Sequence, residues 1–133
     1  MSGELATYLD SSAIVKLAVR EPESGALRRY VRRRRPLVSS ALAVTEVTRA
    51  LLPLGREAVE RGLEVLARIE LARVSDRVLR AAGTLLPAEL RSLDAIHLAT
   101  AQQFGDDLGL VVTYDTRMSV AAGSLGFSVT APS

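Results

Sequence analysis

Cysteine is absent from this 133-residue sequence, and its absence removes several kinds of chemistry at once. Disulfides, thiolate metal sites such as zinc ribbons, and cysteine nucleophiles are all excluded. A chain without cysteine also fits a reducing compartment, where disulfides rarely persist. The chemistry of this protein must therefore rest on other side chains.

A secretory signal and a membrane-spanning run are also missing. The N-terminus has no positively charged region followed by an apolar core, and no apolar run approaches the roughly 18 residues that a spanning helix needs. We therefore expect a soluble, cytoplasmic protein without a membrane partner. Hydrophobic residues make up 48% of the chain, which is enough for one compact domain over residues 1–133 with its own core.

Lysine is nearly missing, since Lys16 is the only lysine among the 17 basic residues. The arginines are dense in "RRYVRRRR" at residues 28–35, although the formal net charge of the chain is only +2. Arginine binds phosphate well, so this run is one candidate for contact with a nucleic-acid backbone. It is equally explained as a solvated helix end that the helix dipole stabilises.

Short apolar segments alternate with helical patterns along the chain. Strands are predicted at residues 5–10, 37–40, 69–74, 108–115 and 127–132. Helices are predicted at residues 11–19, 21–36, 41–54, 56–69, 75–86, 92–104 and 116–126, with Ser92 as the cap of the sixth. This order predicts an α/β sandwich with a mostly parallel sheet, in which ligands gather at the carboxyl ends of the strands.

Four acids stand in surroundings that are unusual for surface carboxylates. Asp10 and Asp115 close apolar strands, Glu46 lies among apolar helical residues, and Asp94 lies in the first turn of an apolar helix. Singly, each has a structural explanation: the three aspartates suit helix starts, and Glu46 is spaced to pair with Arg49. A buried carboxylate is costly unless it is paired or bound to metal, so together they predict a shared site.

Carboxylates without cysteine ligands suit Mg²⁺ or Mn²⁺, which prefer oxygen donors. Such cations activate water and stabilise charge on phosphoryl groups, so phosphodiester hydrolysis is the chemistry that this set favours. The segments "YLDSSAIVKL", "TEVTRAL", "SLDAIHLATA" and "VVTYDTRMSVAA" resemble, in order and context, the acidic motifs of PIN-domain ribonucleases, most closely the VapC toxins of bacterial toxin–antitoxin pairs. The resemblance spans essentially the whole chain.

The resemblance implies a PIN-like three-layer α/β/α sandwich with a mostly parallel central sheet of four to five short strands. It implies an endoribonuclease that needs Mg²⁺ or Mn²⁺, cuts RNA as a toxin, is neutralised by a cognate VapB-like antitoxin and forms a homodimer. Carried across by motif, the metal-binding and catalytic residues are Asp10, Glu46, Asp94 and Asp115. The supporting polar residues are Ser12 and Thr113.

Two further residues near these motifs have open roles. Arg117 follows Asp115 closely and is a candidate contact for an RNA phosphate, or a partner for an acid of the site. His97 is the only histidine and lies three residues after Asp94, on the same helix face. It is either a general acid or substrate contact, or a hydrogen-bonding residue of the core, and the second interpretation is favoured.

Two other functions remain to be weighed. A receiver-type signalling domain has a similar length, a parallel sheet and an acidic Mg²⁺ pocket, but it needs a lysine near a late strand end, and none follows Lys16. A PIN-like interaction module without catalytic activity is the second alternative. The complete set of acids argues against it, and a titration without metal binding would argue for it.

Overall fold

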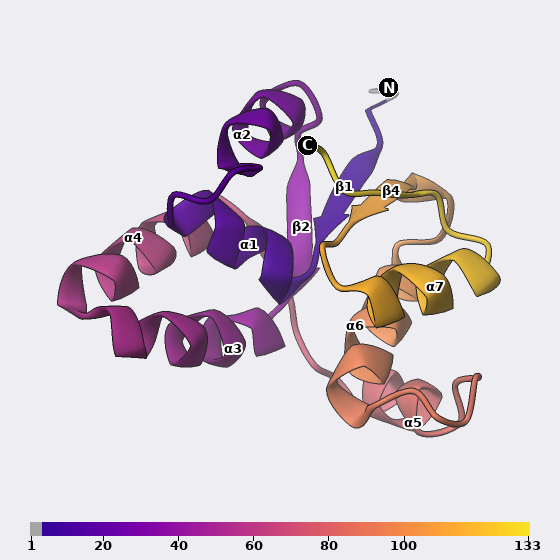
Figure 1. Ribbon diagram of the computed structural model, residues 1–133. Coiled ribbons are helices and arrows are strands. Elements are labelled where there is room, and N and C mark those ends of the chain that lie inside the picture. The colour runs from indigo at the N-terminus through magenta and orange to yellow at the C-terminus, as the bar shows by residue number, and fades with distance from the viewer. Residues whose placement is uncertain (1–3) are drawn as a thin grey trace.

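Five parallel strands form one sheet at the centre of the computed structural model, which describes residues 4–133 (Figure 1). The first three residues of the predicted domain 1–133 lie outside that range. The strand order is β3-β2-β1-β4-β5, and every pairing is parallel. The strands are β1 (Ala6–Leu9), β2 (Leu37–Ser40), β3 (Glu70–Ala72), β4 (Leu108–Val112) and β5 (Val129–Thr130).

Helices cover both faces of this sheet (Figure 1). One group consists of α1 (Ser11–Ala18), α2 (Ser24–Arg32), α3 (Leu42–Leu51) and α4 (Arg56–Leu66). The other consists of α5 (Asp76–Gly83), α6 (Ser92–Gln103) and α7 (Thr116–Ser124). Short 3₁₀ helices follow α3 and α6, at η1 (Leu52–Leu54) and η2 (Gly105–Asp107). The predicted three-layer α/β/α fold is confirmed, and within residues 4–133 no helix is long and apolar enough to cross a membrane.

The central strand β1 is buried on both of its faces. Its one buried threonine, Thr7, donates its hydroxyl to the carbonyl of Arg34 at 2.8 Å. Leu9 packs into the core under α1–α4 with Ile14 and Val47. Its neighbour Tyr8 points to the opposite layer and packs with Val38, because successive strand residues face opposite sides of a sheet. The sheet therefore has a core on each side.

The start of α2 and the cap of α6 differ from the predictions. Helix α2 begins at Ser24 rather than at residue 21, because the Ser24 hydroxyl is anchored outside the helix: it donates to the carbonyls of Lys16 and Val19 and accepts from the amide of Glu21. Helix α6 has Arg91 at its N-cap, so the prediction of a Ser92 cap was wrong. Ser92 is the first helical residue of α6 instead.

The direction of the strand order reverses between β1 and β4, and this reversal locates the site. From β1 the chain adds β2 and β3 on one side, whereas β4 pairs with the other side of β1 and is followed by β5. In open α/β sheets the crevice at such a reversal, outside the carboxyl ends of the strands, is where ligands bind. Asp10 directly follows β1 at this position, and the loop after Val112 of β4 carries Asp115.

Candidate active site

The four acids singled out in the sequence line one pocket of about 440 Å³ at this crevice. They come from four parts of the fold: Asp10 follows β1, Glu46 lies on α3, Asp94 lies in the first turn of α6, and Asp115 caps α7. Ser12 and His97 line the same pocket. Residues separated by up to 105 positions in the chain thus share one cavity because the parallel strands end at a common edge.

Asp10 is the most buried of these carboxylates, with 3% of the residue exposed. One carboxylate oxygen accepts from the hydroxyl of Ser12 at 2.6 Å and from the amide of Ala13 at 3.1 Å, and the other accepts from the hydroxyl of Thr113. Burial raises the pKa of Asp10, and these hydrogen bonds oppose that rise. The residue therefore caps α1 and also presents a buried carboxylate to the pocket.

Ser12 and Thr113 also fasten the loop after β4 to the start of α1. The oxygen of Ser12 accepts from the amide of Tyr114 at 2.9 Å, and that of Thr113 accepts from the amide of Asp115 at 3.0 Å. Each hydroxyl thus donates to Asp10 and accepts from the backbone that leads to Asp115. Two acids distant in sequence are held in one rigid network by this pair of residues.

Glu46 is oriented by residues from outside its own helix. Its carboxylate accepts from the hydroxyl of Ser11 at 2.5 Å and lies 2.6 Å from Nε2 of His97. The partners of the Glu46 carboxylate among the described residues are Ser11 and His97, and the structure gives no ion pair between Glu46 and Arg49. Burial acts to raise the pKa of Glu46, but the hydrogen bonds from His97 and Ser11 outweigh it, and the net pKa is lowered.

His97 connects this carboxylate to the interior of the sheet. The side chain is 2% exposed, and its Nδ1 lies 2.7 Å from the hydroxyl of Tyr8, whose ring meets the imidazole edge to face. A neutral imidazole with its proton on Nε2 satisfies both contacts, because it accepts from Tyr8 and donates to Glu46. Burial raises the pKa of Tyr8, which keeps its hydroxyl protonated as the donor.

Asp94 and Asp115 are joined by an arginine that the sequence analysis missed. Nε of Arg91 donates to Asp94 at 3.2 Å, and Nη2 donates to Asp115 at 3.5 Å. The arginine side chain is 59% exposed, whereas that of Asp94 is 14% exposed. A signal was present in the sequence, since Arg91 precedes Asp94 by three residues, the spacing of neighbours on a helix.

Arg117 is placed differently. Its backbone amide donates to the carboxylate of Asp115 at 2.8 Å as part of the α7 cap, while its side chain is exposed. It lines a second hollow of about 450 Å³ together with Arg91 and Asp94. Arg91 therefore lines both the acid pocket and the second hollow, whereas Arg117 lines only the second hollow.

The oxygen atoms that line the pocket are of the type that a hard divalent cation prefers as ligands. The pocket supplies carboxylate and hydroxyl oxygens, and the carboxylates of Asp10 and Glu46 are held by hydrogen bonds. Over residues 4–133, however, no three His, Asp or Glu side chains are already arranged as a metal cage. In the arrangement described, Arg91 supplies positive charge to Asp94 and Asp115, and the imidazole of His97 contacts Glu46.

Comparisons with known proteins agree with this architecture. A family model described as the PIN domain matches residues 7–124. Ribonuclease VapC46 of Mycobacterium tuberculosis is 66% identical over 128 residues, a match that covers 96% of this chain and 98% of that protein. Ribonuclease VapC35 of the same organism is 42% identical over 130 residues, or 94% of this chain and 96% of that protein.

Solved structures share the fold at lower identity. The crystal structure of Mycobacterium tuberculosis VapC20, described as a sarcin-ricin loop cleaving toxin, aligns with a TM-score of 0.76 at 16% identity and covers 95% of this chain and 99% of its own. A toxin–antitoxin complex from Klebsiella pneumoniae aligns with a TM-score of 0.73 at 22% identity, covering 96% and 98%. These similarities concern the fold.

Proposed function

Since the chain belongs to the PIN-domain family and, within it, to the VapC ribonucleases, we propose that it is a metal-dependent endoribonuclease and the toxin of a toxin–antitoxin pair. The observation that carries the proposal is the pocket lined by carboxylates from four separate parts of the fold. The match to the PIN-domain model argues against the alternative of a receiver-type signalling domain. We place its action in the cytoplasm, on RNA.

The proposed cofactor is Mg²⁺, with Mn²⁺ as a possible substitute, held by Asp10, Glu46, Asp94 and Asp115. Such a cation supplies an activated water and neutralises charge on the phosphoryl group. Ser12 and Thr113 keep the carboxylate of Asp10 in place, and Ser11 and His97 do the same for Glu46. These hydrogen bonds reduce the reorganisation that the carboxylates need when they bind charge.

Arg91 has two positions in this proposal. Without a cation it neutralises Asp94 and Asp115, as in the structure described. With these carboxylates bound to a cation, the exposed guanidinium of Arg91 would be free to bind an RNA phosphate beside Arg117, which lines the same second hollow. Neither arginine then needs to move a proton, because both act through charge.

A protein antitoxin and a second copy of the chain are the proposed partners. Large apolar side chains are exposed on several elements, including Leu86, Leu93 and Val120, which are 68%, 48% and 69% exposed. Such groups are the ones that an interface buries. Light scattering of the purified chain measures the dimer, and co-purification with the product of the adjoining reading frame tests the antitoxin.

The catalytic proposal is tested by RNA cleavage with Mg²⁺, with Mn²⁺ and with a chelator. Asp94→Asn and Asp115→Asn are expected to lower cleavage by at least about a hundredfold, because each removes a charge that the cation and the transition state need. Asp107→Asn is the matched control, since this exposed acid lies in η2 outside the pocket. Full activity of both pocket variants, or cleavage that persists in chelator, would refute the proposal. A wild type that neither cleaves RNA nor binds either metal would favour the inactive interaction module.

A further inference from the structure

Seven arginines form a basic surface around α2, at a distance from the acid pocket. We call it the arginine surface, and its members are Arg28, Arg29, Arg32, Arg33, Arg34, Arg35 and Arg68. All are exposed except Arg34, which is partly buried. Within residues 4–133 the structure gives none of them an ion pair, and no acidic residue lines either of the hollows described below.

The charge of the chain is therefore strongly uneven. The arginine surface contributes +7, while the whole sequence has a formal net charge of +2, so all other residues together carry −5. Two nearby acids, Glu21 and Glu23, are bound by Lys16 at 2.9 and 2.8 Å. A concentrated positive field of this kind attracts polyanions from solution.

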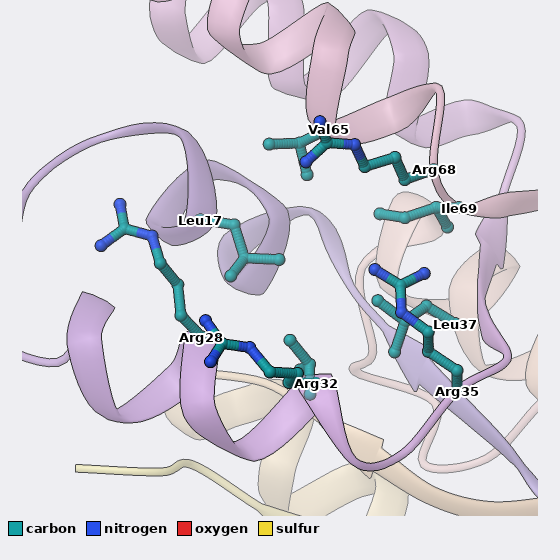
Figure 2. A pocket seen from close by; sticks show the side chains of 9 residues that line it. Leu17, Arg28, Arg32, Arg35, Leu37, Val65, Arg68 and Ile69 are labelled. Carbon is teal, nitrogen blue, oxygen red and sulfur yellow. The ribbon is translucent and has the colours of Figure 1, made fainter.

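The first hollow of the arginine surface has a volume of about 210 Å³ (Figure 2). Arg28 and Arg32 extend from α2 on one side of it, and Arg68 lies across from them beside Val65. Leu17 lies between these two sides, among other aliphatic residues of the lining. Guanidinium groups thus surround an aliphatic floor.

A second hollow of about 620 Å³ adjoins α2 and shares Arg32 with the first. In it the guanidinium of Arg34 lies over the ring of Tyr30, 3.7 Å from its centroid, and donates to the Tyr30 carbonyl at 3.3 Å. A guanidinium held over an aromatic ring is a group on which an RNA base can stack.

We propose that the arginine surface binds the phosphate backbone of RNA at a position separate from the acid pocket. The inference rests on the proposed ribonuclease activity and names a further contact for its substrate. RNA is favoured over an acidic peptide because the arginines line two hollows that meet at Arg32 and include a stacking pair. An extended polyanion uses both hollows, whereas a peptide anchored on the aliphatic floor fills one.

The acid pocket and the first hollow have no lining residue in common. Ser11 of the acid pocket and Leu17 of the first hollow are separated by about 9 Å along the axis of α1. We expect a small phosphodiester held by the carboxylates to make no use of the arginines. A structured RNA of tens of nucleotides spans both places, so the arginine surface should affect only long substrates.

RNA affinity measured in chelator tests the proposal without requiring cleavage. The variant Arg28→Gln/Arg32→Gln/Arg68→Gln is compared with Arg56→Gln/Arg77→Gln/Arg80→Gln, which removes three exposed arginines outside the arginine surface. For a fluorescent RNA of about 40 nucleotides we expect the first variant to bind at least about tenfold more weakly. We also expect the salt dependence of log K to be shallower by about 2, since each phosphate contact contributes about 0.7 on single-stranded RNA.

Hydrolysis of bis(p-nitrophenyl) phosphate, a small phosphodiester, supplies the second readout. It should proceed equally in the wild type and both variants, because the acid pocket is unchanged, while the KM for the long RNA rises only in the first variant. Equal affinities of the two variants for RNA would overturn the inference. So would a first variant that keeps its RNA affinity and loses only binding of an acidic peptide. A wild type that binds RNA through these arginines but cleaves nothing would instead refute the catalytic proposal.

Discussion

Replacing Tyr8 by phenylalanine removes a single hydroxyl from the middle of β1. Tyr8 is 1% exposed, and this hydroxyl lies 2.7 Å from Nδ1 of His97, which is itself 2% exposed. The aromatic ring remains in place against its strand neighbours, so no large cavity forms. The substitution therefore removes the hydrogen bond to His97 at the base of the acid pocket, along with the interactions of the hydroxyl with Ser39 and Ser40.

The expected cost follows from what is left behind. Without the hydroxyl, Nδ1 of His97 stays buried without its partner, and a buried polar atom of this kind costs about 1–3 kcal/mol. For a chain of this size, 1 kcal/mol corresponds to roughly 3–4 °C in Tm. We therefore expect Tyr8→Phe to lower the free energy of unfolding by about 1–3 kcal/mol and the Tm by roughly 3–12 °C.

Urea unfolding in the presence of chelator measures this difference without a contribution from bound metal. Tyr114→Phe is the matched control: its hydroxyl also makes one hydrogen bond, to the carbonyl of Pro132 at 2.6 Å, but the residue is only partly buried, so water can replace the bond. We expect the control to lose less than about 1 kcal/mol. If Tyr8→Phe were no less stable than Tyr114→Phe, the hydroxyl would not hold His97, and the support inferred for Glu46 would fail.

Three further predictions address charge and packing. In chelator, Asp10→Asn should be more stable than the wild type at neutral pH, and the difference in stability should shrink as pH falls. The reason is that burial raises the pKa of Asp10. Protonated Asp10 therefore stabilises the fold at low pH, and this contribution is lost as pH rises through the pKa of the folded state. Urea unfolding between pH 4 and about 8 checks this, and a gap that widened toward acid would contradict it. Arg91→Gln should bind Mn²⁺ more tightly by about 1.4- to fivefold in calorimetry, because an exposed competing ion pair worth about 0.2–1 kcal/mol is gone, yet it should cleave RNA more slowly. Arg117→Gln should leave the Mn²⁺ affinity unchanged, and equal Mn²⁺ affinities of the wild type and Arg91→Gln would rule out competition. Gly62→Ala should destabilise the chain by about 1–3 kcal/mol, since its new Cβ would come too close to the buried Leu51 side chain. Gly83→Ala has open space around the new Cβ and should stabilise α5 by up to about 1 kcal/mol. Thermal unfolding that ranked the two variants in the opposite order would show that α3 and α4 can separate at no cost.

The sequence by itself determined the order of the elements and the fold class. Apolar residues repeat with different periods in strands and in amphipathic helices, and these repeats can be read in the sequence. The five strands and seven helices are therefore predicted close to their observed ranges. The ends were less certain, because caps such as Arg91 and anchors such as Ser24 depend on contacts outside the local pattern. The four acids were also visible, since carboxylates in apolar surroundings are expensive.

The resemblance named Ser12 and Thr113 as supporting residues, but only the tertiary structure decided which acid each supporting side chain holds. Hydrogen bonds that join Tyr8 to His97, Ser11 to Glu46 and Thr113 to Asp10 cross 35 to 103 positions of the chain, and no helical or strand period encodes such pairs. The same holds for Arg68, which joins the arginines of α2 only because the chain after α4 lines the same hollow from the opposite side. The periodicity of a sequence shows which residues share one face of a single helix or strand. The hydrogen bonds that hold a carboxylate depend instead on where separate helices and strands meet.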